Sequence, residues 1–138
     1  MIMIIIINIM FNYKIMNVKT NILDKIFIIM LISVFFTNGI MKILNFDQTI
    51  KWVESYNYPS ELVYIGIFVE LLAPMLILIN LYRKLAIYSL IIFCIMTAIM
   101  FHSNVSNPME LTQFLKNFGL AAGFYFLGKS EQHNYFRT

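Results

Sequence analysis

The sequence predicts an all-α integral membrane protein, an antiparallel four-helix bundle with a short interfacial helix between the first and second spans. Three observations lead to this prediction. Of the 138 residues, 60% are apolar and 12% are charged, whereas soluble domains are usually about 25% charged. The apolar residues gather in four segments that approach the roughly 20 residues a membrane-spanning helix needs. Short links between the later segments make neighbouring helices antiparallel.

The four apolar segments are nearly free of charge. The first and third hold no charged residue, and the second holds only Glu70. The fourth is interrupted by Glu110 in its first turn and by Lys116 and Asn117 further in. A soluble four-helix bundle would show a polar stripe along one face of each helix. The third segment has only Ser89, Cys94 and Thr97 as polar breaks, which disfavours that alternative. The segments are residues 26–41, 62–82, 85–101 and 109–128.

The links between the segments predict where helices begin and end. Residues 82–84 join the second and third segments, and residues 102–107 join the third and fourth. Asn107, Pro108 and Glu110 have the order of N-cap, N1 and N3 residues, so we expect a helix to begin there.

The longest link, residues 45–59, has a helical pattern of its own. One face of the expected helix is apolar and another is polar, so we expect it to lie in the membrane interface with Trp52 at headgroup depth. A plain polar loop is the alternative. The apolar face consists of Phe46, Ile50, Val53 and Tyr56, and the polar face of Gln48, Lys51 and Ser55.

The distribution of basic residues predicts the orientation. We expect both termini in the cytosol, because cytoplasmic loops carry the excess of Lys and Arg. We expect residues 1–21 to form an accessory or disordered leader, residues 22–129 the membrane domain, and residues 130–138 a polar C-terminal tail. The loops on the non-cytosolic side of the membrane carry only two basic residues, Lys42 and Lys51. The expected cytosolic side carries Lys14, Lys19, Lys25, Arg83, Lys84, Lys129 and Arg137.

Polar residues inside the expected bundle gather in its outer half. At about 1.5 Å per residue, Glu70 and Lys116 each lie roughly 13–15 Å below the same outer surface, which suggests an ion pair. Charges in hydrocarbon are costly, so each needs a partner, a cavity or a function. The alternatives are a purely structural pair, a Lys42 that extends to the interface, and an ordinary interfacial His102. The predicted polar cluster is Asn38, Lys42, Glu70, His102, Lys116 and Asn117.

The sequence also excludes several chemistries as expectations. The single cysteine allows no internal disulfide, and no Cys/His spacing suits a metal. A lone histidine near the membrane cannot supply bis-histidine haem ligation. No nucleophile with its base is visible, and the scattered basic residues form no nucleic-acid surface. Small residues should let helices approach closely: Gly66, Ala73, Gly119 and Gly123.

A series of motifs follows one another along the chain: Asn38-Gly39-Ile-Met-Lys42-Ile, Tyr58-Pro59, Glu70-Leu-Leu-Ala-Pro-Met-Leu-Ile-Leu, Tyr82-Arg83-Lys84-Leu-Ala, His102, Phe114-Leu-Lys116-Asn117 and Ala121-Ala-Gly123. The order of these motifs resembles the DoxX family of small four-span membrane proteins over residues 22–129. Ala122 departs from the pattern, because the family usually has a second glycine there. The resemblance implies the four-span fold and a membrane subunit associated with respiratory or redox complexes, such as those of quinol oxidation or of defence against thiol stress.

The sequence favours a non-catalytic membrane subunit or scaffold with a polar cavity, although it does not decide whether the chain is an enzyme. One alternative is a redox-complex subunit that binds a quinone-like cofactor. There Glu70 and His102 would exchange protons, and Lys42 or Lys116 would hold an anionic oxygen. The other is a small proton-coupled carrier. The expected partners are the lipid bilayer and another membrane or redox subunit, and no haem, metal or nucleic acid is expected.

Overall fold

The computed structural model describes residues 21–135, with side chains described as far as Ser130. This part of the chain is all-helical, as predicted, and contains no strand. The expectations for the leader lie outside the described residues except at Asn21, and those for residues 136–138 lie outside them entirely. The helices are α2 (Ile22–Leu44), α3 (Phe46–Ser55), α4 (Glu61–Leu78), α5 (Arg83–Phe101) and α6 (Pro108–Tyr135).

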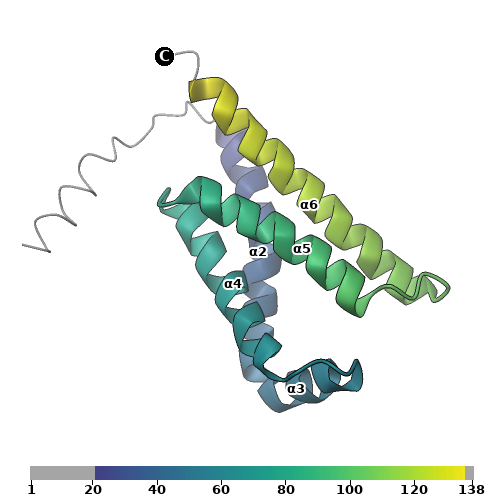
Figure 1. Cartoon of the computed structure of the whole chain (residues 1–138). Helices are drawn as coiled ribbons and strands as arrows, with labels where there is room; N and C mark the ends of the chain where they lie inside the picture. The colour runs from purple at the N-terminus through teal and green to yellow at the C-terminus, as the bar shows by residue number, and fades with distance from the viewer. Residues whose placement is uncertain (1–20, 136–138) are drawn as a thin grey trace, which may run out of the picture.

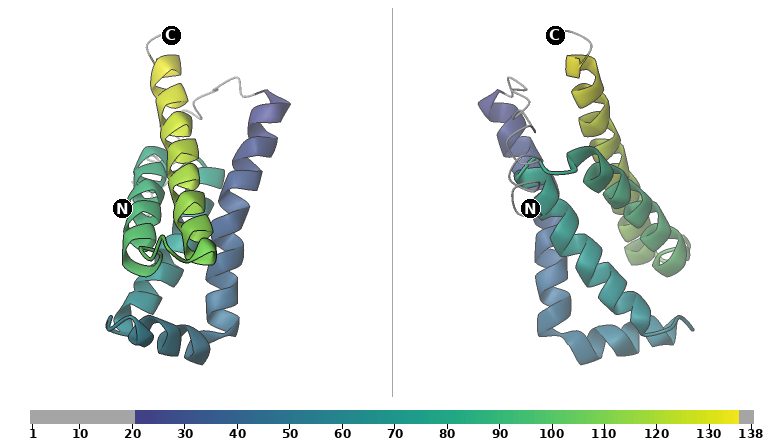
Figure 2. Two further views of the ribbon diagram at one scale, coloured as in Figure 1. Left: turned by 90° about the vertical axis from the view of Figure 1, so that its right-hand side faces the viewer. Right: turned by 60° about the vertical axis from the view of Figure 1, so that its left-hand side comes forward.

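The four long helices alternate in direction along the chain (Figure 1). Helix α4 packs against both α2 and α5, and α5 packs along α6. Helix α3 crosses one end of the bundle between α2 and α4, at the opposite end from the last described turns of α6 (Figure 2). We call this end the α3 end. The helix pairs α2–α4 and α5–α6 are therefore joined mainly through α4 and α5.

Helices α2, α4 and α5 are each long and apolar enough to cross a membrane. At most a third of the most apolar stretch of each is buried inside the bundle. Large apolar side chains such as Phe27, Phe68 and Ile92 instead point outward. A water-soluble protein rarely exposes so large an apolar surface, whereas lipid tails solvate it. Helix α6 is longer, with 28 residues, but more polar.

The link between α4 and α5 differs from the prediction. Helix α4 ends at Leu78 rather than near Tyr82, and Arg83 and Lys84 begin α5 instead of joining the two helices. Asn80 has a left-handed backbone with φ of 58°. This conformation lets the N–H of Leu81 donate to the carbonyl of Leu76 at 3.0 Å, which closes the helix in a Schellman-type turn. Asparagine tolerates this conformation better than most residues.

The start of α6 agrees with the prediction. The helix begins at Pro108, and the Asn107 side-chain oxygen accepts a hydrogen bond of 2.9 Å from the N–H of Met109. Ser60 behaves differently at the start of α4, because it has helical backbone angles and its side chain makes no capping hydrogen bond. Residues 102–107 form the predicted link between α5 and α6.

The predicted amphipathic helix is present as α3, and its apolar face points into the protein. Val53 is buried in a small cluster with Val63 and Phe101. The other three residues of the predicted apolar face, Phe46, Ile50 and Tyr56, pack against this cluster. The polar side chains Gln48, Lys51 and Ser55 are exposed.

The main core fills the half of the bundle away from the α3 end. Ile77, Ile87, Leu90, Cys94 and Phe124 are completely buried there. The rings of Phe35 and Phe124 meet edge to face with centroids 5.4 Å apart, and this contact ties α2 to α6. The remaining polar side chains of the bundle interior therefore lie nearer the α3 end.

Candidate functional site

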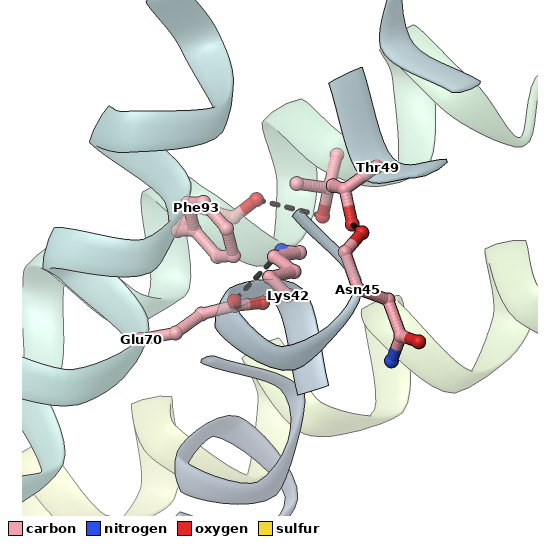
Figure 3. Close-up of polar contacts among 6 residues, drawn as sticks. Lys42, Asn45, Thr49, Glu70 and Phe93 are labelled. Carbon is pink, nitrogen blue, oxygen red and sulfur yellow. Dashed lines mark hydrogen bonds and ion pairs between the residues drawn. The ribbon is translucent and has the colours of Figure 1, made fainter. Parts of the chain in front are cut away.

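A buried ion pair connects α2 and α4. The Lys42 Nζ lies 2.7 Å from the Glu70 Oε2, and Figure 3 shows the two side chains pointing at each other. Glu70 is only 3% exposed, and it is the one buried charged residue in the part of the chain that the structure describes. The Lys42 ammonium also lies 5.5 Å from the centroid of the Phe93 ring, within range of a cation–π interaction.

Gly39 allows the helices that carry this pair to come close together. A Cβ atom on Gly39 would lie 2.8 Å from the Leu71 Cδ2 and 3.3 Å from the Glu70 Cβ, so only glycine permits α2 and α4 to approach this closely. A Cβ atom on Gly66 would lie 3.6 Å from the Lys42 Nζ, which is an ordinary contact distance, so the space around Gly66 does not require glycine. The close approach places the short Glu70 side chain within reach of Lys42.

The roles predicted for small residues need one correction. Gly119 has no atom within 4 Å of where its Cβ would be, so it does not mediate close packing. Gly123 faces Leu31, with 3.3 Å between its would-be Cβ and the Leu31 Cδ1. Gly39 has the tightest surroundings, and its packing role was missed because the sequence does not show which helix faces it.

The direct partner of Glu70 is Lys42 rather than Lys116. Among the described residues, Lys116 forms no ion pair. Sequence spacing predicts the depth of a residue along its helix, but it does not predict the direction in which the side chain points. Lys42 lies on α2, which packs closely against α4, whereas Lys116 lies on α6, across the cavity described below.

A second acid–base pair joins the ends of α5 and α6. The His102 Nδ1 and the Glu110 Oε2 are 2.7 Å apart, and both side chains are partly exposed. The indole of Trp52 lies 6.3 Å from the His102 ring and stacks on Phe101 at 4.8 Å. Glu110 was missed as a partner of His102, although the tight link between α5 and α6 brings the first turn of α6 next to the end of α5.

A cavity of about 190 Å³ lies between these two pairs, and all six residues of the predicted polar cluster line it. Its remaining wall is mostly apolar and aromatic, which is typical of small-molecule sites with a few placed polar groups. The sequence did not predict this apolar wall. It consists of Phe35, Thr49, Trp52, Val53, Leu62, Val63, Gly66, Phe93, Thr97, Phe101 and Leu120.

Part of the cavity wall reaches the surface on α2 and on α6. Asn38 on α2 and Lys116 on α6 both line it and are also exposed at the surface. Further from the α3 end, the Phe35–Phe124 contact closes the seam between these two helices. We therefore take the side of the cavity between α2 and α6, beside the polar cluster, as its opening.

The side chains that line the cavity can form hydrogen bonds and exchange protons. Within residues 21–130, no group of three His, Cys, Asp or Glu side chains is placed to hold a metal ion. Cys94 is free and completely buried in the core. The polar and charged groups that line the cavity are the Lys42–Glu70 pair, His102, Lys116 and the amides of Asn38 and Asn117.

The apolar helices and the polar cavity define a small, multi-pass integral membrane protein. The sequence model of the DoxX family matches residues 26–103, which is more than half of the chain. The protein therefore belongs to the DoxX family, and the resemblance is confirmed. The matched range includes Lys42, Glu70 and His102 and ends before α6. No curated protein and no solved structure matches the chain.

Proposed function

We propose that this protein is a four-span, non-catalytic membrane subunit or scaffold that binds a small amphiphilic molecule in the cavity. The buried Lys42–Glu70 pair on the cavity wall carries this proposal. Well-packed apolar residues often stabilise a protein as well as a buried ion pair does. A pair that faces a cavity is thus better explained by a molecule that it contacts.

The fourth span in this proposal is α6. Its 28 residues extend about 42 Å, enough to cross the hydrocarbon core. Leu115, Phe118, Tyr125 and Phe126 are exposed along it, and they would face lipid tails. The residues that interrupt its apolar sequence, Lys116 and Asn117, line the cavity.

We place both termini in the cytosol and α3 in the opposite interface. Exposed Trp52 at the α3 end would lie at headgroup depth. Cysteine labelling tests this topology in a Cys94→Ala background. A membrane-impermeant thiol reagent should label Lys51→Cys in intact cells and Ser130→Cys only after permeabilisation. The reverse pattern would contradict the orientation, and labelling of both from outside would contradict the fourth span.

The size of the cavity limits the ligand. A cavity of about 150 Å³ is sufficient for benzene, so this cavity of about 190 Å³ accommodates one substituted ring or one compact headgroup. An attached alkyl chain would leave through the opening between α2 and α6 into the bilayer. The proposed ligand is therefore an amphiphile with a small head.

Blocking the cavity tests the proposal. Trp52 is the only tryptophan and lines the cavity, so its fluorescence reports binding. An alkylated benzoquinone and oleate serve as probes in neutral detergent. We expect Leu120→Phe, which fills the cavity, to weaken binding of at least one probe by about tenfold or more.

Leu115→Phe is the matched control for this experiment. Leu115 is on the same helix but is 59% exposed and does not line the cavity, so its variant should bind like the wild type. If neither probe changes the Trp52 fluorescence of the wild type, or if Leu120→Phe binds normally, the cavity is not the binding site.

A redox-complex subunit that binds a quinone-like ring is the second candidate. The observation that favours it is the presence of two acid–base pairs, Lys42–Glu70 and His102–Glu110, at one aromatic-walled cavity. Such pairs could exchange the protons that a quinone takes up, and aromatic rings such as Trp52 could stack on it. Saturable binding of the quinone with no binding of oleate would favour this candidate.

The packed core disfavours the third candidate, a proton-coupled carrier. Ile77, Leu90 and Phe124 have no exposed surface in the half of the bundle away from the α3 end. The cavity therefore stops partway through the bundle in this conformation. Solute uptake into proteoliposomes would be needed to revive the carrier hypothesis.

A further inference from the structure

Three polar side chains beside the opening of the cavity have no partner in the described chain. They are Asn38 on α2 and Lys116 and Asn117 on α6, and all three line the cavity. Among residues 21–130, no hydrogen bond or ion pair involves any of these side chains. The Lys116 ammonium and the two amides are thus available to hydrogen-bond a molecule bound in the cavity.

The charges around the cavity indicate the sign of charge that a bound ligand should carry. Glu70 neutralises Lys42, and Glu110, which contacts His102, does not line the cavity. Lys116 remains as an unpaired cation on an apolar part of α6, roughly 13 Å along the helix from Asn107. An unpaired charge at that depth in a bilayer is costly. The cavity therefore has an excess of positive charge at its opening.

We infer that the cavity selects an anionic amphiphile over neutral and zwitterionic ones. The Lys116 ammonium would donate to an anionic oxygen of a phosphate or carboxylate head, and the amides of Asn38 and Asn117 would donate to it as well. The alkyl chain would pass between α2 and α6 into the bilayer. This inference rests on the proposed function, because it names the ligand class of the same cavity.

Trp52 fluorescence and native mass spectrometry of the full chain in neutral detergent test the inference. The probes are phosphatidylglycerol, oleate, phosphatidylcholine and inorganic phosphate. We expect the first two to bind at least about tenfold more tightly than phosphatidylcholine, because a charge-assisted hydrogen bond is lost with the neutral head. Inorganic phosphate should bind weakly, because it lacks the chain that the opening would accommodate.

Three substitutions distinguish an effect of the Lys116 charge from an effect on the stability of the fold. Lys116→Gln should remove most of the preference for anions, and Lys116→Arg should retain it. Lys129→Gln is the matched control on the same helix, since Lys129 is exposed and does not line the cavity. It should behave like the wild type. Thermal unfolding of each variant without added lipid checks that the bundle is intact.

The outcomes distinguish this inference from the proposed function. If Leu120→Phe blocks binding while Lys116→Gln keeps the preference for anions, the cavity binds a ligand but the inference is wrong. If the wild type shows no preference, the inference is also wrong, and an acidic group from a second copy or another subunit becomes the partner of Lys116. If Leu120→Phe has no effect on any probe, the proposed function fails first.

Discussion

Replacing Lys42 with methionine is expected to destabilise the bundle by about 3–5 kcal/mol, the usual cost of leaving one member of a buried ion pair alone. Glu70 is only 3% exposed and forms its ion pair with Lys42 alone among the described residues. Lys51→Met is the control, because Lys51 is exposed on α3 and its variant should lose little. Reversible unfolding in mild detergent measures the difference.

Glu70→Gln should cost less than Lys42→Met. Lys42 is 26% exposed and lies near the Phe93 ring, so its long side chain keeps a partner and some access to water. The double variant should lose less than the sum of the two single variants, because no buried charge remains unpaired. Strictly additive losses would show that the pair seen here does not contribute to stability.

Double-mutant cycles of this kind compare Lys42 and Lys116 as partners of Glu70. Lys42 should show a coupling energy with Glu70 that is clearly larger than that of Lys116, because only Lys42 forms an ion pair with it. A larger coupling with Lys116 would restore the pairing expected from depth alone. If the Lys42–Glu70 pair also serves the ligand, the double variant should regain stability while it still fails to bind the probes.

Alanine at Gly39 and alanine at Gly119 should change stability in opposite directions. The Gly39→Ala Cβ would meet the Leu71 Cδ2 at 2.8 Å and the Leu71 Cγ at 2.9 Å, and overpacking of this kind costs about 1–3 kcal/mol. Gly119 has open space around it, so Gly119→Ala should stabilise the helix by about 0.5–1 kcal/mol. Thermal unfolding in detergent measures both.

A second substitution shows whether the clash is the cause. Leu71→Ala removes the atoms that the new Cβ would meet, so Gly39→Ala should cost less in that background than in the wild type. Because Gly39 also lies against Glu70, Gly39→Ala should weaken the coupling between Lys42 and Glu70. Equal effects of alanine at the two glycines would contradict the close approach of α2 and α4.

The sequence alone determined the class of protein and the helical content. Long uncharged segments can bury their backbone polar groups in lipid only as helices, so the all-helical membrane fold followed from hydropathy and length. The start of α6 at Pro108 could also be predicted from neighbouring residues, because the Asn107 side chain caps the helix. The end of α4 was missed, since hydropathy continues past Leu78 while the left-handed Asn80 stops the helix.

Spacing along the helices also singled out six polar residues, and the structure places all six along one cavity. Only the tertiary structure decided which of them pair. Depth follows from counting residues along a helix, but the direction of a side chain depends on how each helix is rotated against its neighbours. Close contact at Gly39 brings Lys42 to Glu70, whereas Lys116 stays on the other side of the cavity without an ionic partner in the described chain.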